Sequence, residues 1–129
     1  MLTGLKILVA EDNELSQKIA NFILQKQGAE IYAAYNGRQA IDLLQKNDYD
    51  VILMDLHMPE MGGYEATEYI RNTMQNNIPI IGLTASNWDE EYEECIRKGM
   101  NACIIKPFDA DNLCAAILSV IKENKSIIP

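Results

Sequence analysis

The sequence predicts an α/β fold, an open and doubly wound parallel sheet of five strands with helices on both faces. Short apolar runs alternate five times with segments of helical periodicity, and no repeat or linker interrupts that order. The third run is apolar on both faces, as in a central parallel strand. Consecutive βα units of this kind join through right-handed crossovers. With 129 residues the chain has the length of one domain, so we expect a single domain over residues 1–129.

The first two βα units consist of an apolar run, an amphipathic segment and a weaker second run. We predict strands at residues 6–10 and 30–34, and between them a helix that Asn13 caps and Gly28 ends. A shorter helix follows from residue 36 to residue 44. The longer helix carries an apolar stripe at the spacing typical of an amphipathic helix. The stripe consists of Leu15, Ile19, Phe22 and Ile23.

The remaining units continue the alternation. A loop with Pro59, Gly62 and Gly63 precedes the third helix, and Trp88 and Gly99 mark the start and end of the fourth. The later elements are expected as strand 51–54, a helix including 66–70, strand 80–83, helix 88–98, strand 102–105 and a helix including 113–121.

Composition excludes several classes of function. The chain carries 11 basic and 19 acidic residues, a net charge of −8, which argues against a nucleic-acid binder and against docking on anionic lipid. Its three cysteines match no zinc or redox motif, so a reduced thiol state is expected. No apolar run approaches the roughly 18 residues of a membrane span, and no signal-peptide pattern opens the chain. We therefore expect a cytoplasmic domain without membrane contact.

Polar residues follow four of the five predicted strands. Glu11 and Asp12 follow the first strand, Asp55 the third, Thr84 the fourth and Lys106 the fifth. The carboxyl ends of parallel strands share one edge of a sheet, where such folds bind ligands. Carboxylates crowded there repel one another unless a cation lies among them, and an all-oxygen ligand set favours Mg²⁺.

These residue types suit phosphoryl transfer. A carboxylate beside Mg²⁺ can attack a phosphoryl group, and Asp55 is the expected nucleophile because it follows the most buried strand. Glu11 and Asp12 are expected to hold the metal, Asp12 more directly. The Thr84 hydroxyl can bind a phosphoryl oxygen, and Lys106 supplies a second positive charge.

Four motifs stand in order along the chain: Glu11-Asp12-Asn13, the segment Met54 to Gly63, Leu83-Thr84-Ala85 and Lys106-Pro107-Phe108. Together they resemble a response-regulator receiver domain over about residues 5–123, which would be the core of the domain. Details of the motifs are most similar to receivers found within hybrid sensor histidine kinases. The resemblance implies a flavodoxin-like (βα)5 fold with strand order 2-1-3-4-5.

The resemblance also implies a function in two-component or phosphorelay signalling. Asp55 would accept a phosphoryl group from a phosphohistidine on a histidine kinase or a histidine phosphotransfer domain, and would thereby switch partner binding. The domain would not be an enzyme in its own right, although it would catalyse its own phosphorylation and dephosphorylation. The chain could be a stand-alone regulator or part of a hybrid histidine kinase.

Further roles are implied for the other motif residues. Asp12 and Asp55 would bind Mg²⁺ by their side chains, Glu11 through a water molecule and His57 through its backbone carbonyl. Thr84 would move to the phosphoryl group after transfer and Lys106 would pair with it, and the peptide bond before Pro107 is typically cis.

Three positions depart from the family pattern. The first acid is Glu11 where many members have aspartate, and Gly62 replaces a common aspartate, which should loosen its loop. Cys103 occupies the place of the aromatic switch residue. A thiol cannot rotate inward as a ring does, so output is expected through loop movement or a change in partner affinity.

Two surface features have ordinary interpretations. The His57 side chain is expected at the surface, where it could tune the access of water to the phosphoryl group. The acidic run before Cys95 is expected as a solvated face that complements the helix N-terminus, with partner docking as the alternative. The run consists of Asp89, Glu90, Glu91, Glu93 and Glu94.

Three other functions fit the sequence less well. A degenerate receiver used only for docking is disfavoured by the complete set of Asp12, Asp55, Thr84 and Lys106. A flavodoxin-like flavin module would need a first loop that accepts phosphate, whereas this loop is acidic, and no glycine-rich phosphate motif is present. A phosphatase with an Asp-x-Asp loop would lack its general acid, because His57 occupies that place.

Overall fold

The chain forms a parallel sheet whose five strands lie in the order β2-β1-β3-β4-β5, which confirms the predicted fold and order. The structure is a computed structural model that describes the backbone of residues 1–85 and 89–127 and the side chains of residues 1–85 and 90–123. Trp88 lies outside the described residues. The strands are β1 (Lys6–Ala10), β2 (Glu30–Ala34), β3 (Val51–Asp55), β4 (Ile80–Thr84) and β5 (Ala102–Ile105).

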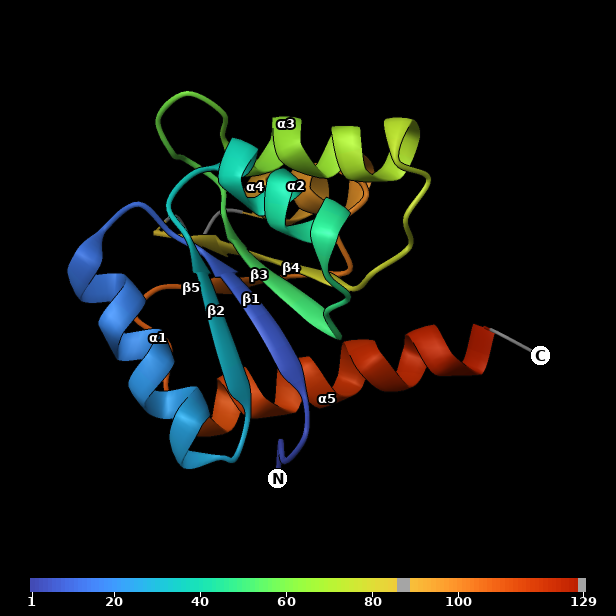
Figure 1. Ribbon diagram of the computed structural model, residues 1–129. Coiled ribbons are helices and arrows are strands. Elements are labelled where there is room, and N and C mark those ends of the chain that lie inside the picture. Colours follow the sequence, from blue (N-terminus) through green and yellow to red (C-terminus); the bar gives the residue numbers. More distant parts are fainter. Residues whose placement is uncertain (86–88, 128–129) are drawn as a thin grey trace.

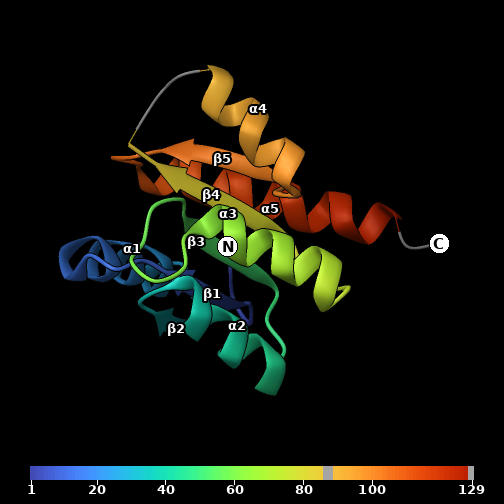
Figure 2. The same cartoon turned by 90° about the horizontal axis from the view of Figure 1, so that it is seen from above.

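Helices cover both faces of the sheet (Figures 1 and 2). On one face lie α1 and α5, and on the other lie α2, α3 and α4 (Figure 1). The helices are α1 (Glu14–Lys26), α2 (Gly37–Lys46), α3 (Gly63–Glu68) with the π-helical turn η1 (Tyr69–Thr73), α4 (Asp89–Lys98) and α5 (Ala110–Ile127).

The strands build two cores because their side chains alternate between the faces. In β3, Ile52 and Met54 face the core under α2, α3 and α4, whereas Val51 and Leu53 face the core under α1 and α5. All four side chains have no solvent exposure. The prediction that this run forms a central strand covered on both sides is therefore confirmed.

The amphipathic helix predicted from the apolar stripe is present as α1, but of the four stripe residues only Ile23 packs against the core. Leu15 and Phe22 are exposed to 67% and 62%, and Ile19 to 46%. The residues of α1 that are buried are Gln17, Ala20 and Leu24 instead.

A polar anchor explains this orientation of α1. The buried Gln17 amide nitrogen lies 3.0 Å from the Val9 carbonyl oxygen, 3.3 Å from that of Glu11 and 3.1 Å from that of Ala34. Carbonyl groups at the ends of β1 and β2 need such a donor once they are buried. The helix therefore turns its glutamine inward and leaves an apolar face to solvent.

The predicted caps of α1 are confirmed. The Asn13 side chain accepts a hydrogen bond from the Ser16 backbone N–H at 2.9 Å, and Gly28 has a φ of 94°, in the left-handed region that favours glycine. The Lys106–Pro107 peptide bond is cis, as the resemblance implies. Within the residues described, every helix is too short or too polar to cross a membrane.

Arg71 of η1 joins three segments at the amino-terminal end of β4 and β5, and sequence analysis did not identify it. Its half-buried guanidinium donates to the Gly99 carbonyl at 2.8 Å, the Asn76 carbonyl at 2.9 Å and Asn101 Oδ1 at 3.0 Å. Asn101 Oδ1 also accepts from the Ile80 backbone N–H, so Arg71 supports the start of β4.

We expect Arg71→Met to lower the free energy of unfolding by about 2–4 kcal/mol, because it leaves three partly buried acceptors without a charged donor. Urea unfolding measures the loss. The matched control is Arg97→Met, whose exposed guanidinium pairs with Glu94 on the same helix and should cost about 0.5 kcal/mol or less. Equal losses in the two variants would contradict the bridging role.

Candidate functional site

The structure brings the predicted acidic residues together at the carboxyl edge of the sheet. Glu11 and Asp12 follow β1, and Asp55 is the last residue of β3. One carboxylate oxygen from each of the three lies within 4.8 Å of the other two. Glu11 and Asp55 are buried, whereas Asp12 is exposed, so the cluster opens to solvent on the Asp12 side. The predicted juxtaposition of the three acids is thus confirmed.

Glu11 is fixed by its backbone. Its N–H donates to the Ala34 carbonyl at 3.0 Å, and its own carbonyl accepts from Gln17. Parallel pairing of β1 with β3 aligns Ala10 with Met54, one residue before each of the buried acids. The register of two neighbouring strands therefore sets the distance between the Glu11 and Asp55 carboxyl groups.

Asp55 is held between β4 and the start of α3. The Leu56 backbone N–H, next along the chain, donates to the Leu83 carbonyl at 3.1 Å. Gly63 packs so closely that an added Cβ would collide with the Asp55 carbonyl oxygen. A side chain at position 63 would thus displace the Asp55 backbone. Close packing of this kind preorganises a reactive group.

His57 lies beside the cluster, as expected for a residue two positions after Asp55. Its backbone N–H donates to Asp55 Oδ1 at 3.3 Å. Its side chain is 76% exposed, which agrees with the expected surface position. The role of its carbonyl as a metal ligand stays a prediction.

Lys106 compensates part of the negative charge. Its ammonium lies 2.7 Å from Glu11 Oε1 and 3.5 Å from Asp55 Oδ2. Burial alone would lower the pKa of Lys106, but the two carboxylates outweigh it and raise the pKa. Burial and the neighbouring Asp55 carboxyl raise the pKa of Glu11 above its ordinary value, although Lys106 opposes the shift. One ammonium therefore leaves the pair of buried carboxyls incompletely neutralised.

The cluster suits a hard cation. Glu11 Oε2 is buried and has no hydrogen-bond partner among the described residues, which is costly for a carboxylate oxygen. The ligand atoms offered by Glu11, Asp12 and Asp55 are all oxygens, and the open Asp12 side leaves room for water. A divalent cation that retains water would satisfy both the charge and the lone oxygen.

Thr84 ends β4, the strand next to Asp55, and is buried. Its hydroxyl donates to Glu91 Oε1 of α4 at 3.3 Å, and the same oxygen lies 3.5 Å from His57 Nε2. The sequence predicts Glu91 on a solvated acidic face, and for this residue the prediction is wrong because its side chain is only 20% exposed. Its acidic neighbours in the sequence differ from it only in the direction in which they point from α4.

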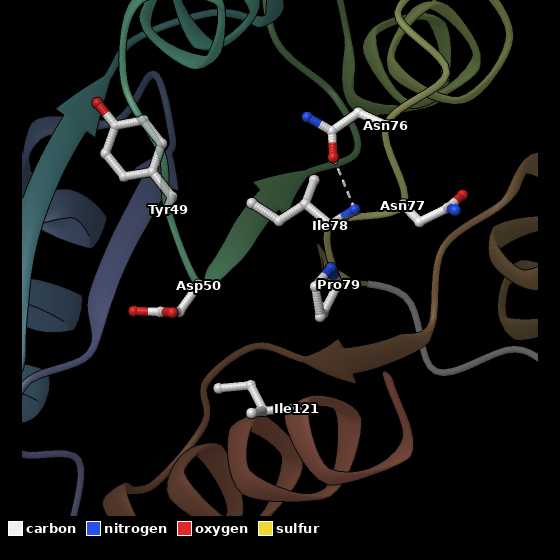
Figure 3. Close-up of a pocket in the computed structure, with 7 residues that line it drawn as sticks. All are labelled: Tyr49, Asp50, Asn76, Asn77, Ile78, Pro79 and Ile121. Carbon is white, nitrogen blue, oxygen red and sulfur yellow. Dashed lines mark hydrogen bonds between the residues drawn. The ribbon is translucent and has the colours of Figure 1, made fainter. Parts of the chain in front are cut away.

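A separate pocket of about 320 Å³ lies at the opposite, amino-terminal ends of β3 and β4 (Figure 3). Its carboxylate, Asp50, already accepts a hydrogen bond from the Lys6 backbone N–H at 2.8 Å. The Asn76 side chain is likewise engaged with the Ile78 backbone N–H (Figure 3). These polar groups serve the local backbone, so the carboxyl edge is the stronger candidate site.

Comparison with known proteins agrees with the geometry. The model of the family described as response regulator receiver domain matches residues 7–118. Among curated proteins, the chain is 32% identical over 145 residues to probable histidine kinase 6 of Oryza sativa subsp. japonica. The match covers 97% of this chain but 15% of the relative, so the chain spans a small part of that protein's length.

Solved structures of similar chains share the fold. The receiver domain of a sensor histidine kinase from Pseudomonas aeruginosa, described with magnesium coordinated in its active-site cleft, has a TM-score of 0.84 at 34% identity, over 93% of this chain and 99% of that one. A second similar structure is the complex of the Saccharomyces cerevisiae histidine phosphotransfer protein Ypd1 with the receiver domain of Ssk1. Its TM-score is 0.83 at 27% identity, and the match covers 88% of this chain and 86% of that one.

The crowded carboxyls should destabilise the metal-free protein. Because Glu11 keeps its proton to a higher pH in the folded chain than in the unfolded chain, folding becomes less favourable as the pH rises above 4.5, the ordinary pKa of this group. We expect Asp55→Asn, in EDTA, to raise the free energy of unfolding at pH 7 by about 1 kcal/mol, since it removes a neighbouring negative charge. Urea unfolding across pH measures the gain.

That gain should shrink as the pH falls toward 4.5, where Glu11 becomes protonated in the unfolded chain as well. The matched control is Asp42→Asn, an exposed acid on α2 that should leave stability within about 0.5 kcal/mol of the parent. A gain that did not depend on pH, or an equal gain at Asp42, would contradict repulsion within the cluster.

Proposed function

Because the chain belongs to the response regulator receiver domain family, we infer that it is a phosphoacceptor in two-component or phosphorelay signalling, with Asp55 as the acceptor. The observation that carries this assignment is the position of Asp55, buried at the carboxyl edge beside Glu11 and Lys106. We propose that residues 1–129 form one receiver unit, which is a phosphorylated switch rather than an enzyme acting on a separate substrate.

Asp55 can act as the nucleophile in this geometry. One Asp55 carboxylate oxygen attacks the phosphorus of a phosphohistidine, the new O–P bond forms as the P–N bond breaks, and the imidazole nitrogen keeps the electron pair and takes up a proton. Lys106, 3.5 Å from Asp55 Oδ2, stabilises the negative charge of the transferred group. We propose that the Thr84 hydroxyl then donates to a phosphoryl oxygen.

We propose Mg²⁺ as the cation of this site. Asp12 and Asp55 would bind it by their side chains, the His57 carbonyl would supply a further ligand, and Glu11 would hold a coordinated water. The ion would shield the charge that builds up on the phosphoryl oxygens and align the attacking oxygen. The proposal is supported by the unpartnered Glu11 Oε2, by the all-oxygen donor set and by the magnesium described for the related receiver.

We propose a histidine phosphotransfer domain or a histidine kinase as the donor, docked on the apolar face of α1. This face consists of Leu15, Ile19 and Phe22, all exposed. It borders a groove of about 240 Å³ that Ile19 shares with Lys106, Pro107 and Phe108, and Lys106 contacts the acceptor. A partner that brings a phosphohistidine to the buried Asp55 would cover this neighbouring surface. The complex of Ypd1 with the related receiver supports the same class of partner.

We further propose that the domain works in the cytoplasm and as one part of a longer histidine kinase. The three cysteines are free thiols in the structure, which suits a reducing compartment. The curated relatives are much longer than the matched segment and are named as histidine kinases. Charge and composition give no support for direct binding to nucleic acid or membrane.

Intact-mass spectrometry after incubation with acetyl phosphate and Mg²⁺ tests the acceptor. We expect a gain of one phosphoryl group that disappears with EDTA and in Asp55→Asn. The matched control is Asp50→Asn, at the opposite end of the same strand, which should be phosphorylated like the parent. A domain used only for docking would show no gain and would not bind beryllofluoride with Mg²⁺ either.

The donor surface is tested by comparing two phosphodonors. We expect Phe22→Ser to slow phosphoryl transfer from phosphorylated Ypd1 by about tenfold, since an exposed aromatic residue in a contact often acts as a hot spot. Phosphorylation by acetyl phosphate should be unchanged. The control Tyr92→Ser removes another exposed ring, from α4, and should affect neither donor. Equal slowing with both donors would show that Phe22 supports the site itself rather than docking.

A further inference from the structure

Glu91, in the first turn of α4, contacts two elements around the acceptor. Its Oε1 accepts a hydrogen bond from the Thr84 hydroxyl at the end of β4 and lies 3.5 Å from the His57 ring in the loop after β3. Tyr64 of α3 lies nearby, with its hydroxyl 3.8 Å from Cys95 Sγ of α4. Burial, the Cys95 thiol and the Glu91 carboxylate together raise the pKa of this tyrosine. One carboxylate therefore connects α4 to the residues around Asp55.

The hydrogen bond between Thr84 and Glu91 competes with binding of a phosphoryl group by Thr84. A hydroxyl has one hydrogen to donate. While the Thr84 hydroxyl donates to Glu91 Oε1, it cannot give a full hydrogen bond to a phosphoryl oxygen on Asp55. Phosphorylation also replaces the single charge of the Asp55 carboxylate with a group of about two negative charges, which repels a nearby carboxylate.

We propose that Glu91 is a positioning residue that holds the Thr84 hydroxyl on the α4 side in the unphosphorylated protein and is released when Thr84 binds the phosphoryl group. This inference rests on the proposed function. Release frees α4 from its contacts with Thr84, and so makes the position of α4 depend on the state of Asp55.

The surroundings of Cys103 agree with a signal that passes from Thr84 to α4 through Glu91. Cys103 of β5 lies where the family pattern has an aromatic switch residue, and its partly buried side chain packs against the core that includes Cys95 of α4. A thiol at this position is too small to follow a movement of Thr84 by rotating inward, as an aromatic ring would. The contact between Thr84 and Glu91 instead joins α4 to the end of β4, the strand next to that of Asp55.

Beryllofluoride binding with Mg²⁺ measures the competition, because the bound ion imitates a phosphoryl group on Asp55. The fluorine NMR signal of the bound species gives its affinity. If Glu91 holds Thr84, Glu91→Ala should bind about three- to tenfold more tightly than the parent, since a competing hydrogen bond is gone. Glu91→Gln keeps an acceptor oxygen and should gain less. Glu90→Ala, which removes an exposed charge from the neighbouring position, is the matched control and should stay near the parent.

The same titration in a Thr84→Ala background decides whether Glu91 acts through Thr84. We expect Glu91→Ala to have no effect on affinity there, as a double-mutant cycle requires for a pair that acts through one contact. The same gain in both backgrounds, or no gain in the first, would overturn the proposal. Thermal melts of each variant separate these results from loss of folding.

Failure of the proposed function would look different. In that case the parent protein would not bind beryllofluoride in a manner that requires Mg²⁺ and Asp55, whatever the residue at position 91.

Discussion

The placement of two buried carboxyls beside a single ammonium is the constraint on which the rest of this structure depends. Glu11 and Asp55 share Lys106, whose ammonium lies 2.7 Å from one and 3.5 Å from the other. Burying such a group is unfavourable unless its charge is balanced, and here the balance is incomplete. The fold tolerates this because β1 and β3 are covered on both faces and fully paired, so the backbone at their ends cannot move to separate the charges.

The sequence predicted the fold and the acidic cluster because both follow from the order of elements along the chain. Alternating strands and helices fix a parallel sheet, and a parallel sheet places every residue that follows a strand at one edge. Glu11, Asp12 and Asp55 come together for that reason alone. No side-chain detail was needed to foresee their contact.

The features that the sequence did not predict depend on how a helix is rotated about its axis and on which way its side chains point. In α1, apolar periodicity identified the face with Leu15 and Phe22, but it cannot distinguish a face that packs in the core from one that is left for a partner. Gln17 decides the orientation, because its amide satisfies carbonyl groups at the ends of two strands. Glu91 was missed for a similar reason, since one acid in an acidic run differs from its neighbours only in the direction in which it points.

Charge imbalance and function are two aspects of one arrangement. Repulsion between the carboxyls lowers the free energy of unfolding when no cation is bound. A cation that binds only the folded state raises it again. Because Thr84 ends the strand next to that of Asp55, a change of charge on Asp55 acts close to the hydrogen bond between Thr84 and Glu91. A fully neutralised edge would give a more stable domain, but it would bind a cation more weakly and respond less to a phosphoryl group. The repulsion between carboxyl groups at the sheet edge therefore makes the domain sensitive to a bound cation and to a phosphoryl group on Asp55.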